Sequence, residues 1–255
     1  MSDYDRYANS RVGAGYARSG AAVDQGLRAY MIGVYNYMTL GLGVTGLVAY
    51  AAFALGTVSV GGGRLALTDF GHAIYQSPLR WLIVLSPLAL VFWLSAGIER
   101  MSVATARNAF IAFAALIGLS MSALLVVYTG ASIGRAFFAA AAAFASLSLY
   151  GYTTQRSLSA MGSFMMMGVI GLIVASLLNL FLHSTGLQFG ISILAVVIFA
   201  GLTAWDTQSI KDMYYAGDGW DVAQKKSIHG ALRLYLDFIN MFQALLMLTG
   251  SQRNN

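Results

Sequence analysis

The chain has 255 residues, of which 58% are hydrophobic and 10% charged, and its formal net charge is +5 at pH 7. A soluble domain carries about 25% charged residues because its surface faces water, so this composition excludes an ordinary soluble domain and favours a polytopic membrane protein. The absence of cysteine excludes disulfides and thiolate metal sites, and the scattered basic residues, paired only at Lys225–Lys226, argue against nucleic-acid binding.

The N-terminal segment, residues 1–30, mixes charged residues with glycine and serine. It has no apolar stretch of the kind that forms the centre of a cleaved signal peptide. We therefore predict a flexible cytoplasmic tail over residues 1–30, a transmembrane domain over residues 31–250 and a short C-terminal tail over residues 251–255.

Six apolar runs follow this tail, and each is bounded by a charged residue or by a break that contains glycine. A helix needs about 20 mostly apolar residues to cross the hydrocarbon core of a bilayer. The runs are Met31–Leu55, Trp81–Ile98, Asn108–Tyr128, Ala136–Tyr152, Met161–His183 and Leu187–Trp205. We predict a helical span at each, and an irregular, glycine-rich connection over residues 56–80.

The last apolar segment, Ala231–Thr249, is interrupted by Arg233, Asp237, Asn240 and Gln243. Spacings of four, three and three place these polar residues on one helical face. The segment could be an amphipathic helix on the membrane surface or a span whose polar stripe faces the bundle interior. We favour the span, because a carboxylate within a span is tolerated where it faces protein or water. The predicted fold is an all-α bundle of seven transmembrane helices.

The orientation of the chain follows from lysine and arginine in the short connections. With the N-terminus in the cytoplasm, eleven basic residues fall inside and four outside. Those inside are Arg6, Arg11, Arg18, Arg28, Arg100, Arg107, Arg156, Lys211, Lys225, Lys226 and Arg233, and those outside are Arg64, Arg80, Arg135 and Arg253. We therefore predict a cytoplasmic N-terminus and a C-terminus outside.

Two carboxylates stand out within the predicted spans. Asp206 ends the sixth apolar run and Asp237 lies nearly two turns into the seventh, so both fall near the cytoplasmic end at similar depth. An ionisable group at a span centre costs about 2.5–3.5 kcal/mol and so points to a function. Two carboxylates in one low-dielectric site cannot both ionise cheaply, so we expect the pair to share a proton and to titrate as a unit. Calcium prefers carboxylate oxygens, which makes Asp206 and Asp237 a candidate pH sensor and calcium-binding site.

Spacing alone leaves an alternative open, in which Asp206 is a solvated helix end and Asp237 is neutralised by Arg233. Arg100, at the inner end of the second span, is a further candidate ion-pair partner. Glu99 beside it and Asn240 are candidate members of a polar pathway. The chain contains no catalytic motif of the zinc-protease, P-loop or nucleophile-elbow type, so we expect neither enzymatic activity nor a required cofactor.

Four stretches of the chain resemble the Bax inhibitor-1 family, also called the transmembrane Bax inhibitor motif family, in its bacterial branch. They are GLSMSALLVVYTGASI, SLYGYTTQRSLSAMGSF, FAGLTAWDTQSIK and GALRLYLDFINMF, in the family's order. The resemblance implies a seven-helix bundle with the last helix at its centre. It also implies that Asp206 and Asp237 form a paired pH sensor that controls a calcium leak, with an arginine at the position of Arg100 nearby. Two residues depart from the family pattern: Trp205 replaces the usual Tyr or Phe, and Ser157 replaces a common acid.

The function expected from this resemblance is a pH-sensitive calcium leak across a bacterial inner membrane. Its partners are then the lipid bilayer, protons and calcium as the transported or bound ion. One rival is a regulator that binds other membrane proteins, because some bacterial relatives resemble modulators of a membrane-bound quality-control protease. Another rival is a transporter of a small metabolite.

The predicted topology is testable with reporter fusions. A reporter enzyme that is active only in the periplasm, fused after Asn255, is expected to be active, because the excess of basic residues holds the N-terminus inside and seven spans bring the C-terminus outside. Activity of a cytoplasm-specific reporter at the same position would indicate six spans, with the last segment re-entrant or lying on the surface.

Overall fold

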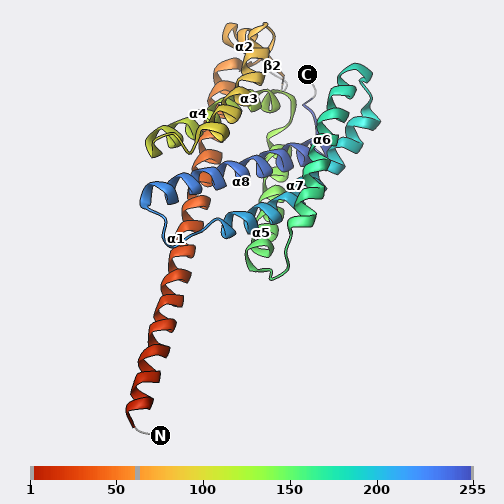
Figure 1. Cartoon of the computed structure of the whole chain (residues 1–255). Coiled ribbons are helices and arrows are strands. Elements are labelled where there is room, and N and C mark those ends of the chain that lie inside the picture. The colour runs from red at the N-terminus through yellow and green to blue at the C-terminus, as the bar shows by residue number, and fades with distance from the viewer. Residues whose placement is uncertain (1–2, 61–63, 254–255) are drawn as a thin grey trace.

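The computed structural model describes the backbone of residues 3–60 and 64–253, and side chains from Gln25 onward within those ranges. The first helix, α1 (Asp3–Gly56), continues beyond the other helices at its N-terminal end (Figure 1). Its apolar part begins at Gln25, so the segment predicted as a tail lies largely in the same helix as the first span. The flexibility of that segment stays a prediction.

Seven helices in the described part of the chain are long and apolar enough to cross a membrane. They are the Gln25–Gly56 part of α1, α3 (Leu79–Gly97), α4 (Val103–Val127), α5 (Gly130–Thr153), α6 (Ser159–Leu182), α7 (Thr185–Asp212) and α8 (Trp220–Thr249). The predicted seven-span bundle is thereby confirmed. The helix α8 begins eleven residues before the predicted segment, because its first turns carry polar residues that hydropathy alone does not assign to a span.

Short connections between the spans end in side-chain caps. The hydroxyl groups of Ser102, Thr129 and Ser184 accept hydrogen bonds from the backbone N–H three residues on, at the starts of α4, α5 and α7. Each cap satisfies one of the N–H groups that the first turn of a helix leaves free. These tight turns make neighbouring spans run in opposite directions.

The connection over residues 56–80 is more regular than predicted. The strands β1 (Thr57–Ser59) and β2 (Leu65–Leu67) pair antiparallel, and the short helix α2 (Asp69–Tyr75) follows. In the described part of this connection the prediction of an irregular segment was wrong, because paired strands satisfy backbone groups that an open loop leaves to water. The glycines at 61–63 lie outside the described residues. The hydroxyl of Tyr75 donates to that of Ser122 at 3.0 Å, which holds α2 against α4.

The bundle has two ends, which we call the amino side and the carboxyl side. At the amino side lie the start of α8 and the apolar start of α1, where the Tyr37 hydroxyl donates to Gln224 Oε1 at 3.1 Å. At the carboxyl side lie the ends of both helices, where the guanidinium of Arg253 stacks over the Phe53 ring at 5.7 Å. The helices α1, α4, α6 and α8 run from the amino to the carboxyl side, and α3, α5 and α7 return.

The last helix occupies the centre of this bundle. It packs against α1, α4, α5 and α7, and it crosses the middle of the molecule in Figure 1. Fourteen of its thirty residues are buried, whereas α6 at the periphery buries only Gly162 and Leu172. Such central burial excludes a helix lying on the membrane surface and confirms the predicted place of the last span.

Small residues allow the helices to approach closely. At Gly151 of α5, an added Cβ atom would lie 2.1 Å from the carbonyl oxygen of Ala204 on α7. In lipid, helix association depends on this kind of close backbone packing rather than on water exclusion. The α5–α7 contact therefore depends on the absence of a side chain at residue 151.

Gly151→Ala is expected to destabilise the protein by about 1–3 kcal/mol, the usual range for overpacking, because α5 and α7 must separate to admit the methyl group. Thermal unfolding of the detergent-purified protein measures the effect. The matched control is Gly43→Ala on α1, where an added Cβ meets nothing within 4 Å. Equal stability of the two variants would show that the α5–α7 contact is not limiting.

Candidate functional site

The carboxyl group of Asp206 is buried and paired. It lies on α7 with 8% of its side chain exposed, and its Oδ1 atom accepts a hydrogen bond from Arg233 Nη2 of α8. The alternative of a solvated helix end is therefore wrong for Asp206. An ion pair with so little exposure joins the two helices more strongly than a pair in water, because solvent screens it less.

The guanidinium of Arg233 is held entirely by α7. Besides the bond to Asp206, its Nη1 atom donates to the hydroxyl of Ser209 at 3.2 Å, and its Cζ atom lies 5.2 Å from the centre of the Trp205 ring. Cations bind favourably over the face of an indole ring. Trp205, which departs from the family pattern, therefore helps to orient the arginine that neutralises Asp206.

The second carboxyl group, that of Asp237, lies beside the first. Asp237 is buried near the middle of α8, close enough to Asp206 for each carboxyl group to influence the charge of the other. Its Oδ2 atom is buried and has no partner among the described residues. That the two carboxyl groups share a proton stays a prediction; with that proton, Asp206, Asp237 and Arg233 together would carry no net charge.

The structure brings Arg233, and not Arg100, to the carboxyl pair. Arg100 is exposed in the turn between α3 and α4, and within the described ranges it forms no ion pair. Glu99 beside it is also exposed, and its backbone carbonyl accepts a hydrogen bond from Lys225 Nζ at 2.9 Å at the amino side. Asn240 lies one turn beyond Asp237, toward the carboxyl side. Glu99 and Asn240 therefore lie on opposite sides of the carboxyl pair, and their membership of a polar pathway stays a prediction.

Hydroxyl groups that sequence reasoning missed connect the helices beside Asp206. The hydroxyl groups of Tyr35 and Ser148 lie 2.6 Å apart, and those of Ser148 and Thr207 lie 3.0 Å apart. This series of hydroxyl groups links α1, α5 and α7 next to Asp206. Isolated hydroxyl residues in apolar runs have no distinctive pattern, and the only signal in the sequence was the position of Thr207 directly after the aspartate.

Gln208 completes the Asp-Thr-Gln segment. Its Oε1 atom accepts a hydrogen bond from the backbone N–H of Leu158 at 2.8 Å, and its Nε2 atom donates to the carbonyl of Arg156 at 2.9 Å. The amide thus holds the connection between α5 and α6 against α7. Three consecutive residues of α7 are therefore tied to three different parts of the bundle.

The carboxyl pair supplies only part of a calcium shell. Calcium takes six to eight oxygen ligands, whereas two carboxyl groups offer four oxygens, one of which accepts from Arg233. In the described ranges no group of three or more His, Asp or Glu residues comes together. The two carboxyl groups alone therefore do not complete a calcium shell, and calcium binding at this pair stays a prediction.

Comparisons with known proteins agree with this architecture. Residues 27–254 match the family described as inhibitor of apoptosis-promoting Bax1. The chain is 46% identical over 231 residues to an uncharacterized protein of Rickettsia prowazekii, covering 91% of this chain and 93% of the relative. It is 42% identical over 266 residues to an uncharacterized protein of Caulobacter vibrioides, covering 99% and 100%. The inner membrane protein YbhL of Escherichia coli is 41% identical over 231 residues, covering 89% and 94%.

A double-mutant cycle tests the ion pair. Asp206→Asn and Arg233→Gln are each expected to destabilise the protein, and the double variant should lose less than the sum, with a coupling of about 1–3 kcal/mol for residues in direct contact. Unfolding of the detergent-purified protein gives the free energies.

The control cycle combines Arg233→Gln with Glu99→Gln, which removes a carboxylate that Arg233 does not touch. That combination should be additive to within about 0.5 kcal/mol. Additivity in both cycles would contradict a direct bond between Asp206 and Arg233.

Proposed function

This chain belongs to the Bax inhibitor-1 family of multi-pass membrane proteins, and from that membership we propose that it is a pH-sensitive calcium leak channel of a bacterial inner membrane. The observation that carries the proposal is the buried group formed by Asp206, Asp237 and Arg233 at the centre of the bundle. The relative YbhL is named as an inner membrane protein, which supports the proposed location.

Proton and cation compete for the same oxygens in this proposal. A calcium ion that reaches the two carboxyl groups has to displace their shared proton, and binding to deprotonated ligands always releases protons in this way. It also has to displace the guanidinium of Arg233 from Asp206, because that positive charge occupies an oxygen and repels a second cation. In this proposal, the state in which Arg233 is paired with Asp206 is therefore the non-conducting state.

In this proposal, water reaches the group from the amino side. Arg233 is 24% exposed, against 8% for Asp206, and it lies one turn from Asp237 toward the amino side of α8. The amino side also carries most of the basic residues, which supports a cytoplasmic position for it under the positive-inside rule. In this proposal the pair senses cytoplasmic pH.

Calcium flux through liposomes that contain only the purified protein tests the proposal. The flux of the wild type is expected to change between mildly acidic and mildly alkaline pH. Asp206→Asn and Asp237→Asn should each remove that dependence, because neither variant can share a proton, and the double variant should resemble either single one. Asp221→Asn is the matched control, because it removes an exposed carboxylate from the same helix.

Two results would contradict the proposal in different ways. Additive effects of the two substitutions would show independent carboxyl groups and no paired sensor. A wild-type protein that passes no calcium at any pH would exclude the leak, and binding to other membrane proteins would become the function to test.

A further inference from the structure

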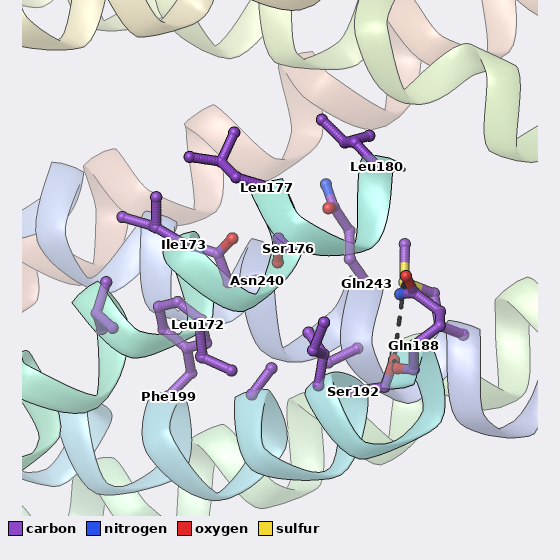
Figure 2. A pocket seen from close by; sticks show the side chains of 15 residues that line it. Leu172, Ile173, Ser176, Leu177, Leu180, Gln188, Ser192, Phe199, Asn240 and Gln243 are labelled. Carbon is purple, nitrogen blue, oxygen red and sulfur yellow. Dashed lines mark hydrogen bonds between the residues drawn. The ribbon is translucent and has the colours of Figure 1, made fainter. Parts of the chain in front are cut away.

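A crevice of about 400 Å³ opens between α6, α7 and α8 (Figure 2). It belongs to the carboxyl half of the bundle, because it begins beside Asn240 and reaches Met247 near the end of α8. Most of its lining is apolar, but five polar side chains enter it. These are Ser176, Gln188, Ser192, Asn240 and Gln243.

The polar side chains of the crevice continue the faces that carry the carboxyl pair. On α8, Asn240 and Gln243 follow Asp237 at intervals of three residues. On α7, Gln188 precedes Asp206 by eighteen residues, which is five turns at 3.6 residues per turn, so the two share a face. Phe199 lies on that face midway between Ser192 and Asp206 and also lines the crevice. One polar track on each helix therefore leads toward the pair, with an aromatic ring between.

The amide groups in the crevice are not satisfied by protein alone. Asn240 Nδ2 donates to the carbonyl of Leu236 at 2.8 Å. Gln188 accepts from Asn179 Nδ2 at 3.1 Å through its Oε1 atom and donates to Met247 Sδ at 3.4 Å through its Nε2 atom. The side chain of Gln243 forms no hydrogen bond with any part of the chain that the structure describes. Hydrocarbon offers no partner for such groups, and each unsatisfied one costs several kcal/mol, roughly. Water in the crevice would supply the missing bonds.

A second cavity, which we call the axial cavity because the central helix α8 forms one of its walls, has the opposite character. It has a volume of about 180 Å³ between α1, α4, α5 and α8, and the rings of Phe137, Phe238 and Phe242 line it. Its single polar side chain is Thr45, whose hydroxyl lies 2.6 Å from that of Tyr235 and donates to the carbonyl of Ala114 at 2.9 Å. The lining of the axial cavity therefore offers no free polar group to bind water, so a cation that crossed this cavity would lack hydration.

We propose that the crevice between α6, α7 and α8 is the water-filled vestibule through which cations pass between the carboxyl side and the pair Asp206 and Asp237. The route leaves the bundle laterally, along the polar tracks of α7 and α8, and avoids the axial cavity. Phe199 lines the crevice on the stretch of α7 between Ser192 and the pair. This inference rests on the proposed leak and adds the path that the ion takes.

Substituted cysteines test the route, and the chain has no cysteine of its own to interfere. Ser192→Cys and Gln243→Cys place a thiol in the crevice, and Ala49→Cys places one in the axial cavity as the matched control. Each variant, reconstituted in liposomes, is treated with a membrane-impermeant, positively charged methanethiosulfonate. The mass of the protein reports labelling and calcium flux reports the route.

Both crevice cysteines are expected to gain the mass of the label and to lose calcium flux severalfold, because the bound cation repels calcium. Ala49→Cys should stay unlabelled and conduct as before. A crevice without label would be filled by lipid, and label without loss of flux would place the ion elsewhere; either result overturns the route. Block at Ala49→Cys alone would assign the path to the axial cavity.

Failure of the leak itself is distinguishable from failure of the route. If the untreated variants and the wild type pass no calcium, the proposed function is overturned and the cation route with it. The mass measurement does not depend on flux, so it still decides whether water fills the crevice.

Discussion

The ion pair between Asp206 and Arg233 organises the centre of this molecule, since it joins α7 to α8 where neither residue could remain charged alone. Removing one partner of a largely buried pair leaves a charge that lipid and protein solvate poorly. Trp205 and Ser209 hold the guanidinium from the same helix. The pairing also leaves Asp237 without a cation of its own among the described residues, as the proposed proton shared with Asp206 requires.

The Asp-Thr-Gln segment shows how a short run of residues can position such a pair. Asp206 binds α8, Thr207 reaches the hydroxyl of Ser148 on α5, and Gln208 holds the backbone between α5 and α6. In a bundle without a hydrophobic driving force between helices, directional bonds of this kind and close contacts at glycine determine which helices are neighbours. The same bonds that assemble the bundle therefore set the geometry of the site.

Polarity is distributed unevenly around α8, and this asymmetry bears on how an ion could cross the bundle. Toward α1, α4 and α5 the helix presents phenylalanine rings, whose edges and faces pack against one another. Toward α6 and α7 it presents Asn240 and Gln243. A helix buried at the centre can separate a dry half of the bundle from a wet half, because its two faces contact different neighbours.

The sequence by itself determined the seven spans and their order, because apolar runs of the length of a bilayer are strong signals. Four polar residues on one face of Ala231–Thr249 indicated that this face contacts protein, whereas the central place of the last span followed from the family resemblance. Topology placed Asp206 and Asp237 at one depth, and the resemblance, rather than their spacing, made them a pair.

Only the tertiary structure decided which arginine meets the pair. Arg100 and Arg233 lie at similar depth in the sequence-based topology, but the rotation of α8 against α7 turns Arg233 to Asp206, and Arg100 lies exposed in a turn. The support from Ser148 and the pairing of β1 with β2 were likewise beyond prediction. Hydropathy reports how deep a residue lies, whereas contacts depend on helix rotation and side-chain packing, which no single-chain pattern encodes.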